Sequence, residues 1–471
     1  MNQNKKVKLF LENFIFYGGI SMLQKALPFI TLPIITKLLP DSKNYGISDM
    51  FNLIISFGSA IAILGMYDAI FREYFEKKED ENYKKTVTST GLWIVLVSSL
   101  IVASMIFLFN KQISVYLFSE KTYKNLIILS AIGIYISSIN TIVISPTRMK
   151  NQRKIFFFTG ISFPLIGFIV AFYFLKIGFT YEALIYGTVI MNLLSLIFFY
   201  VLNRREFSLK KFDKRVAKEL LKIGIPLVPT FLIYWIFHSM DRLMISKMLG
   251  TAELGIYSVG AKVSSISQLI YTAFAGGWSY FAFSTMKDKE QVKINSKVFE
   301  YLGIVSFTIF IIAQPFISPV FNIFFEGDYI RGKEVFSFLF LSPLILMLFQ
   351  TVGNQVIVVK KSYLSTAALL LGALLNIFLN YILIDGYGIE GAAFSTLNSY
   401  FISVILMCII CYKLNLFSIS KRFLVITGLL IMGIYCNFFL KEYVYYKIIY
   451  SLTFGLIILN YIKDLKYLLK K

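Results

Sequence analysis

The residues best placed to do chemistry in this 471-residue sequence are charges set inside long apolar stretches. Lys25, Arg242 and Lys262 each stand within a mainly apolar run, and Asp241 adjoins Arg242. A charge inside a membrane span costs about 2.5–3.5 kcal/mol on insertion scales, so charges kept there usually face a partner or a watery cavity. Three cations against one anion favour an anionic substrate, and phosphate above all.

Polar side chains share the helical faces that carry these charges. Tyr234, His238 and Asp241 follow one another at spacings of four and three, which puts them on one face of a helix. The candidate substrate-binding residues are Lys25, Arg242, Lys262, Gln24, Asn52 and Tyr234. The candidates for coupling to an ion gradient are Asp241 and His238.

Simpler roles stay open for the same residues. Asp241 can neutralise Arg242 or Lys262 in a buried ion pair. His238 can be a hydrogen-bonded structural group. The Ser and Asn stripes of the neighbouring spans can hold helices together.

The elements that must position these residues are membrane-spanning helices. The chain is 57% hydrophobic and 15% charged, with a mean hydropathy of +0.71, whereas soluble domains are about 25% charged. We expect an all-α polytopic membrane protein of about fourteen transmembrane helices. Their approximate limits are 10–38, 45–71, 87–109, 123–145, 155–175, 181–202, 222–247, 254–283, 298–325, 335–359, 363–384, 390–412, 423–440 and 445–462.

The net charge of +21 sets the orientation and does not point to nucleic acid. Lys and Arg lie in short clusters between spans and are about three times as numerous on the side that holds both ends of the chain, which predicts cytoplasmic termini. We therefore expect no nucleic-acid partner. Cys408 and Cys411 have the spacing of a metal site but lack a second pair, so we expect no metal and no cofactor.

An internal repeat organises the spans. Residues 35–39 (ITKLL) match 245–249 (ISKML) at an offset of 210, and 45–47 (YGI) match 254–256 (LGI) at 209. Spans one to six therefore correspond to spans seven to twelve. The expected domains are a six-helix bundle at 1–202, a basic amphipathic linker at 203–221, a second six-helix bundle at 222–412, and two appended helices at 413–471.

The first span of each half is interrupted, which points to moving elements. Broken helices at matching places in two halves mark the binding site and hinges of transporters. The candidate hinge residues are Gly18, Gly19, Pro28, Pro226 and Pro229. The linker between the halves carries apolar residues at helical spacing among Lys and Arg, and we expect it to lie on the inner membrane surface.

Two motifs carry a resemblance to a known family. Asp241-Arg242 followed by 247–250 (KMLG) and 254–257 (LGIY) resembles the signature of polysaccharide biosynthesis transporters, and 388–393 (GIEGAA) resembles a second motif of that group. These transporters are the Wzx-type flippases of O-antigen and capsule repeat units, in the superfamily of the MATE multidrug exporters and the lipid II flippase. The resemblance covers essentially the whole chain.

The resemblance implies a function as well as a fold. It implies two six-helix bundles around a central cavity and movement of an undecaprenyl-pyrophosphate-linked oligosaccharide to the outer leaflet of the bacterial cytoplasmic membrane. Coupling to a H⁺ or Na⁺ gradient is implied too, with the bilayer, a polysaccharide polymerase and a chain-length regulator as partners. A lipid II flippase and a multidrug or cation exporter remain alternatives. No catalytic motif occurs in the short external loops, so we do not expect an enzyme.

Overall fold

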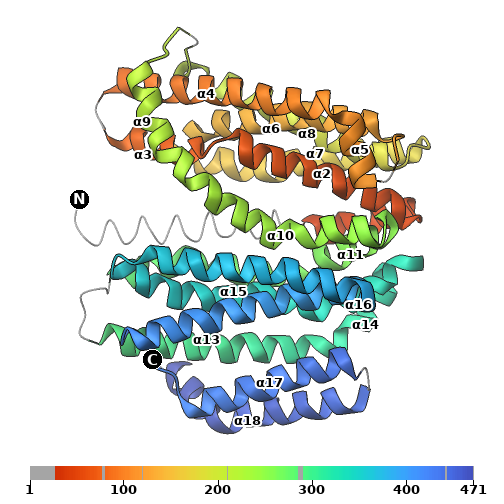
Figure 1. Ribbon diagram of the computed structural model, residues 1–471, viewed down its shortest axis with the longest axis vertical. Coiled ribbons are helices and arrows are strands. Elements are labelled where there is room, and N and C mark those ends of the chain that lie inside the picture. Colours follow the sequence, from red (N-terminus) through yellow and green to blue (C-terminus); the bar gives the residue numbers. More distant parts are fainter. Residues whose placement is uncertain are drawn as a thin grey trace. The chain divides into compact units, whose positions relative to one another are not determined.

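The structure is a computed structural model that describes residues 27–76, 80–118, 120–208, 210–284, 290–440 and 443–469. Within these ranges all regular structure is helical and no strand occurs. The chain divides into two packing units, Met1–Val259 with Phe325–Tyr329, and Gly260–Phe324 with Ile330–Lys471. Each unit is a set of long helices joined by short turns (Figure 1).

The first unit begins, in the described residues, with the helix Leu27–Leu38. Nine further α-helices and two short 3₁₀ turns belong wholly to this unit, and α11 (Thr251–Ser264) begins in it. They are α2 (Ser42–Ala62), α3 (Met66–Glu76), α4 (Glu81–Leu108), α5 (Asn110–Phe118), α6 (Lys124–Met149), α7 (Arg153–Lys176), α8 (Tyr181–Asn203), α9 (Lys214–Gly224), α10 (Val228–Met248) and the 3₁₀ turn η2 (Ile225–Leu227). The short turn η1 (Arg204–Glu206) follows α8.

The second unit continues from the end of α11. Its helices are α12 (Ser267–Ser284), α13 (Gln291–Ala313), α14 (Ile317–Phe324), α15 (Lys333–Val358), α16 (Ser362–Lys413), α17 (Lys421–Phe439) and α18 (Tyr443–Leu469). Helix α16 is broken at Gly388, whose φ of 60° and ψ of −141° are not helical. The break separates residues 362–387 from 389–413, and each stretch is long enough to cross a membrane.

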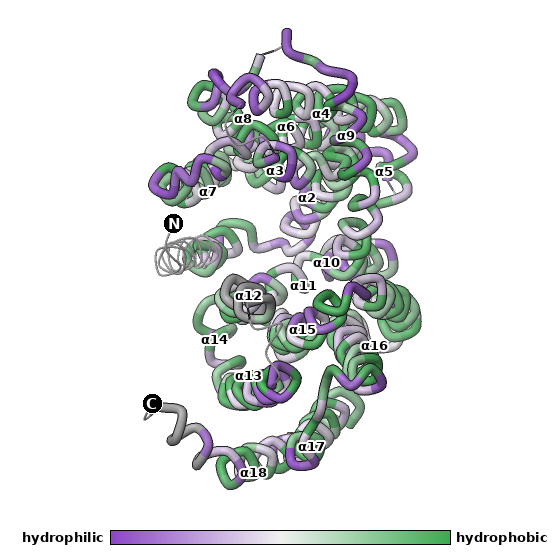
Figure 2. The backbone as a smooth tube through the Cα atoms, turned by 90° about the vertical axis from the view of Figure 1, so that its left-hand side faces the viewer, coloured by the Kyte–Doolittle hydropathy of each residue, from purple (hydrophilic) through white to green (hydrophobic). Residues whose placement is uncertain are grey.

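The all-α membrane fold that the sequence predicts is confirmed. Nine of the described helices are long and apolar enough to span a membrane, or ten when the bent pair α2–α3 is included. The predicted count of fourteen is compatible with this set, because α16 alone holds two predicted spans. Hydrophobic residues dominate the helices, and hydrophilic stretches gather at turns and helix ends (Figure 2).

Two predicted spans are broken where no proline occurs. The predicted span 45–71 is α2 and α3, bent by 42° at Leu64 and Gly65, which have φ of 50° and 68°. A side chain on Gly65 would overlap the backbone of Gly224 at the end of α9. The predicted span 254–283 is α11 and α12, with a turn at 265–266. Proline therefore does not mark either break. At the first one, a left-handed leucine and a glycine end the helix instead.

The predicted hinge residues lie at helix beginnings where the structure describes them. Pro226 is in η2 and Pro229 is in the first turn of α10, where proline's missing N–H has no helical acceptor to lose. Pro28 is in the helix Leu27–Leu38. Gly18 and Gly19 lie outside the described residues. Their role as hinges stays a prediction.

The linker helix α9 packs against two helices of the first unit. Its residues Val216 and Leu220 are buried in one apolar cluster with Ile70 of α3 and Val87 of α4. The apolar face of this amphipathic helix therefore contacts α3 and α4, and its expected position at the inner membrane surface stays a prediction. The basic residues of α9 remain exposed.

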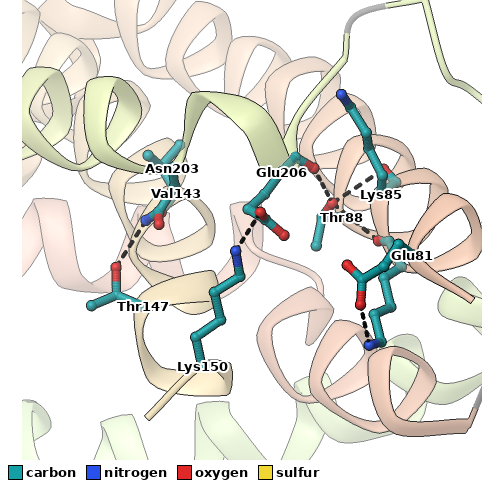
Figure 3. Close-up of polar contacts among 9 residues, drawn as sticks. Glu81, Lys85, Thr88, Val143, Thr147, Lys150, Asn203 and Glu206 are labelled. Atoms are coloured by element: carbon teal, nitrogen blue, oxygen red, sulfur yellow. Dashed lines mark hydrogen bonds and ion pairs between the residues drawn. The ribbon is translucent and has the colours of Figure 1, made fainter. Parts of the chain in front are cut away.

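Polar contacts fix the start of this linker against the bundle (Figure 3). The Thr88 hydroxyl donates to the backbone carbonyl of Glu206 at 2.6 Å. The Asn203 amide donates to the Thr147 hydroxyl at 2.9 Å, and Lys150 pairs with Glu206. The packing border falls at Val259–Gly260; the domain limits drawn from the repeat stay a prediction.

Candidate functional site

Helices α2 and α11 cross at two glycines that the internal repeat relates. A side chain on Gly46 would overlap the carbonyl oxygen of Thr251, and one on Gly255 would overlap that of Ser42. Ser42 and Gly46 lie 209 residues before Thr251 and Gly255, the same offset that separates the hydrogen-bonded pair Asp49 and Ser258. We call Ser42, Gly46, Thr251 and Gly255 the α2–α11 crossing. Its contacts are reciprocal, as expected for two copies of one element that meet on a pseudo-twofold axis.

One turn further along, the repeat-related positions Asp49 and Ser258 face each other. The Ser258 hydroxyl donates to Asp49 Oδ2 at 2.7 Å. Both residues are buried. The hydrogen bond therefore ties α2 to α11 at a second point beside the α2–α11 crossing.

Arg242 of α10 lies beside Asp49 and brings a positive charge to it. Its Nη1 lies 3.6 Å from Asp49 Oδ2, with side chains 26% and 5% exposed. Arg242 Nε is buried and makes no hydrogen bond to any residue that the structure describes. A guanidinium has five N–H donors. The attraction to Asp49 is therefore an ion pair, and at least the Nε–H of Arg242 makes no hydrogen bond among the described residues.

Asp241 accepts two hydrogen bonds beside Arg242. Its Oδ1 accepts a hydrogen bond from the backbone N–H of Arg242 at 2.8 Å, and its Oδ2 accepts one from the Tyr257 hydroxyl. The guanidinium of Arg242 forms its ion pair with Asp49. We call Asp49, Asp241, Arg242, Tyr257 and Ser258 the charged cluster.

The face of α10 that precedes the charged cluster also meets α2. The Trp235 indole N–H donates to the Ser56 hydroxyl at 3.0 Å, and its ring lies 4.8 Å from that of Phe57 between centroids. Tyr234 and His238 are both exposed. Helix α10 therefore contacts α2 through Trp235, while two residues of its predicted polar face are exposed.

The structure leaves the role of the other predicted site residues untested. Asn52 is half-buried on α2 and donates to the Ser48 carbonyl of its own helix at 3.1 Å. Lys262 belongs to the second packing unit. Gln24 and Lys25 lie outside the described residues. Their assignment to substrate binding stays a prediction.

Asp49 is the acidic residue of the charged cluster that the sequence reasoning missed. It stands in the apolar span between Ser48 and Met50, so the rule applied to Asp241 selects it equally. Its place 209 residues before Ser258 was a second signal. No group of three or more His, Cys, Asp or Glu side chains suited to a metal occurs in the part of the chain that the structure describes.

The sequence matches a protein family and several relatives. Residues 34–326 match the family described as polysaccharide biosynthesis protein. The chain is 22% identical over 384 residues to "Uncharacterized membrane protein MJ1068" of Methanocaldococcus jannaschii, which covers 76% of this chain and 74% of that protein. It is 22% identical over 408 residues to "Probable low-salt glycan biosynthesis flippase Agl15" of Haloferax volcanii, with 85% and 81% covered.

Solved structures share the fold. The lipid II flippase MurJ in an inward closed conformation matches with a TM-score of 0.68 at 16% identity, over 97% of this chain and 99% of that one. An inward-facing MATE multidrug transporter of the MOP superfamily matches at 0.64 and 14%, over 83% and 94%. These similarities confirm the MATE-like fold, and the family match covers more than half of the sequence. The chain belongs to the polysaccharide biosynthesis protein family.

Proposed function

We propose that this protein is a flippase for lipid-linked glycans. Its substrate is an undecaprenyl-pyrophosphate-linked oligosaccharide repeat unit of O-antigen, capsule or a related surface polysaccharide. It moves this substrate from the inner to the outer leaflet by alternating access. As a transporter it is not an enzyme, and it needs no bound cofactor.

The observation that carries the proposal is that two repeat-related helices, α2 and α11, contact each other closely beside the charged cluster. Alternating access needs an end of the protein that closes tightly and opens again. The α2–α11 crossing offers glycine contacts that hold only when the helices touch. The Arg242–Asp49 pair of 3.6 Å adds an attraction that solvent weakens once the helices part.

Arg242 supports an anionic substrate because its donor capacity is incompletely used. Asp49 neutralises the guanidinium, yet Nε stays buried without a hydrogen bond among the described residues. A pyrophosphate offers more acceptor oxygens than one carboxylate, so it can accept more hydrogen bonds from arginine. We propose that Arg242 passes from Asp49 to the pyrophosphate as α2 and α10 separate, so that substrate binding favours opening.

The remaining predicted residues complete this scheme. Lys25 and Lys262 add positive charge for the pyrophosphate, and Gln24, Asn52 and Tyr234 contact the sugars. Pro226 and Pro229 supply the hinge before α10, with Gly18, Gly19 and Pro28 in the first span. Asp241 and His238 couple the cycle to a H⁺ or Na⁺ gradient, since a change of charge at Asp241 alters the electrostatics of its neighbour Arg242.

The proposed setting follows from the distribution of charge and from the substrate. The protein is a multi-pass membrane protein, which we assign to the bacterial cytoplasmic membrane with both termini in the cytoplasm. The α2–α11 crossing then lies toward the outer face. A polymerase and a chain-length regulator are the proposed protein partners, because they act on the product in the outer leaflet.

Complementation tests this function. A strain that lacks its repeat-unit flippase receives the protein with Lys25, Arg242 or Lys262 changed to Ala or to the other basic residue. Surface polysaccharide is measured against the amount of protein in the membrane. We expect the Ala forms to insert but to export at least tenfold less, with partial recovery in the basic forms.

The outcomes separate the candidate functions. Normal export by all three Ala forms would remove the cationic site. Rescue of a strain depleted of its lipid II flippase, without rescue of surface polysaccharide, would favour the lipid II alternative. Resistance to cationic drugs that needs Asp241, without any polysaccharide, would favour the exporter.

A further inference from the structure

The second packing unit contains an apolar groove that the flippase scheme does not use. Its volume is about 630 Å³, and it runs between α13, α15, the second half of α16 and α17. Its floor is formed by the buried aromatic residues Phe299, Phe307 and Phe423, and its rim by the exposed residues Ile405 and Leu424.

The groove exists because α16 and α17 contact each other at one end only. Toward the break at Gly388, Phe394 of α16 stacks on Phe438 of α17 with centroids 3.9 Å apart. The Tyr435 hydroxyl donates to Asn398 Oδ1 at 2.6 Å in the same region. Toward Lys413, residues of α16 and α17 line the groove from its two sides instead of packing against each other. Apolar cavities within packed protein are otherwise few and small.

On the opposite side of the groove, α17 is fixed to α13 by aromatic contacts. Phe423 stacks on Phe307 with centroids 5.8 Å apart, and any side chain on Gly303 would overlap its ring. Phe299 contacts Phe417 and Phe423 edge-on. These contacts hold α17 against α13, so a movement of α17 toward α16 that closed the groove would break them.

Charge at one end of the groove suggests what lies in it. Lys413, at the end of α16, is the charged residue of the lining, and the other lining residues are almost all apolar. Charged residues at the ends of spans lie at the level of lipid headgroups. A ligand with an apolar tail and an anionic head fits this polarity.

The groove is large enough for one apolar tail. Its volume is about 630 Å³, which has room for a single fatty acyl chain. A much longer prenyl chain would extend out of the groove past the exposed residues Ile405 and Leu424.

We infer that this groove binds one acyl chain of an anionic glycerophospholipid, whose phosphate is held by Lys413. The lipid fills the space between α16 and α17 and holds the two appended helices against the second bundle. The site is separate from the charged cluster and does not depend on the transported substrate.

Cys408 provides a reporter for this site, because it lines the groove. In the full-length protein with Cys411→Ala and Cys436→Ala, the rate of alkylation of Cys408 by a small apolar maleimide is measured in detergent. We expect phosphatidylglycerol to slow the reaction at least fivefold, and native mass spectrometry to detect one retained phosphatidylglycerol. Lys413→Gln should weaken this protection at least threefold, and Lys413→Arg should keep it.

A pair of substitutions on one helix gives the matched control. Ile405→Trp fills the groove and should abolish lipid retention, whereas Ile402→Trp, outside the lining on the same helix, should leave it unchanged. Protection by undecaprenyl phosphate and not by phosphatidylglycerol would overturn the assignment to an acyl chain. Equal lipid retention by both Trp variants would overturn the site itself.

Discussion

At the scale of single residues, the pairing of Arg242 with Asp49 is the feature with the largest consequences. Both side chains are mostly removed from water, with the carboxylate 5% exposed. A buried ion pair adds little net stability by itself, but removal of one partner leaves an uncompensated charge. The pair is therefore a sensitive place to perturb the contact between α2 and α10.

Asp49→Asn should destabilise the protein because it removes the counter-ion of Arg242. Loss of one partner of a buried pair costs about 3–5 kcal/mol, and the lower value applies here because the guanidinium is about one quarter exposed. A lower melting temperature of the purified protein in detergent checks this. Asp68→Asn, at an exposed position of α3, is the matched control and should leave the melting temperature unchanged.

The double variant Asp49→Asn with Arg242→Gln distinguishes an ion pair from two independent effects. If the residues interact, the double variant should be more stable than Asp49→Asn alone, because it no longer buries an unpaired cation. Simple additivity of the two single losses would show that the 3.6 Å approach contributes nothing measurable.

At the scale of elements, the α2–α11 crossing depends on two residues without side chains. Gly46→Ala and Gly255→Ala each place a methyl group against a backbone carbonyl, which cannot rotate away as a side chain would. We expect both variants to keep α2 and α11 apart and to reduce polysaccharide export at least tenfold. Export is measured relative to the amount of protein in the membrane.

A third glycine controls for helix propensity in this experiment. Gly428 lies in α17 with open space around the position of a Cβ atom. Gly428→Ala should therefore keep export at the wild-type level and gain slightly in helix stability. A comparable loss in all three variants would mean that the glycines act through folding and not through the crossing.

The packing of α9 makes a separate prediction about the linker. Leu220 is fully buried in the cluster with α3 and α4, so Leu220→Ala should cost about 2–5 kcal/mol. The loss is measured as faster proteolysis within the linker of the purified protein. Lys218→Ala, on the exposed face of α9, should not change the rate; a helix held only by anionic lipid would show the opposite pattern.

At the scale of the whole molecule, the sequence predicted the fold class well and the site only in part. Hydropathy alone sufficed for the helical membrane fold, because backbone groups in lipid must be satisfied within a helix. The breaks in α2–α3 and α11–α12 escaped because they need no proline. The charged cluster was half predicted: Asp241 and Arg242 were chosen, while Asp49 was overlooked and its pairing needs tertiary contacts.

The repeat explains why the crossing could not be recognised from either half alone. Gly46 and Gly255 are each one of two glycines in an apolar helix, and glycines are common in membrane helices. Only the offset of 209 relates them, and only the structure brings both to one contact. A repeat-related pair of small residues can therefore mark where two halves of a transporter meet.

If the two repeats must separate at this contact during transport, then a covalent link across it should stop export. Ser42→Cys with Thr251→Cys spans the α2–α11 crossing, in a background where the native residues Cys408, Cys411 and Cys436 are alanine. We expect a short thiol-cleavable crosslinker to abolish export and a reductant to restore it.

A crosslink within one predicted bundle is the control that distinguishes a blocked transport cycle from chemical damage to the protein. Asn140 of α6 and Ser195 of α8 are hydrogen-bonded at 3.1 Å, and both belong to the first six predicted spans. Crosslinked Asn140→Cys with Ser195→Cys should export normally, since a bundle that moves as a rigid body keeps this distance. Export that continues with the crossing fully crosslinked would mean that α2 and α11 stay together throughout the cycle, and the moving contact would then have to lie elsewhere in the protein.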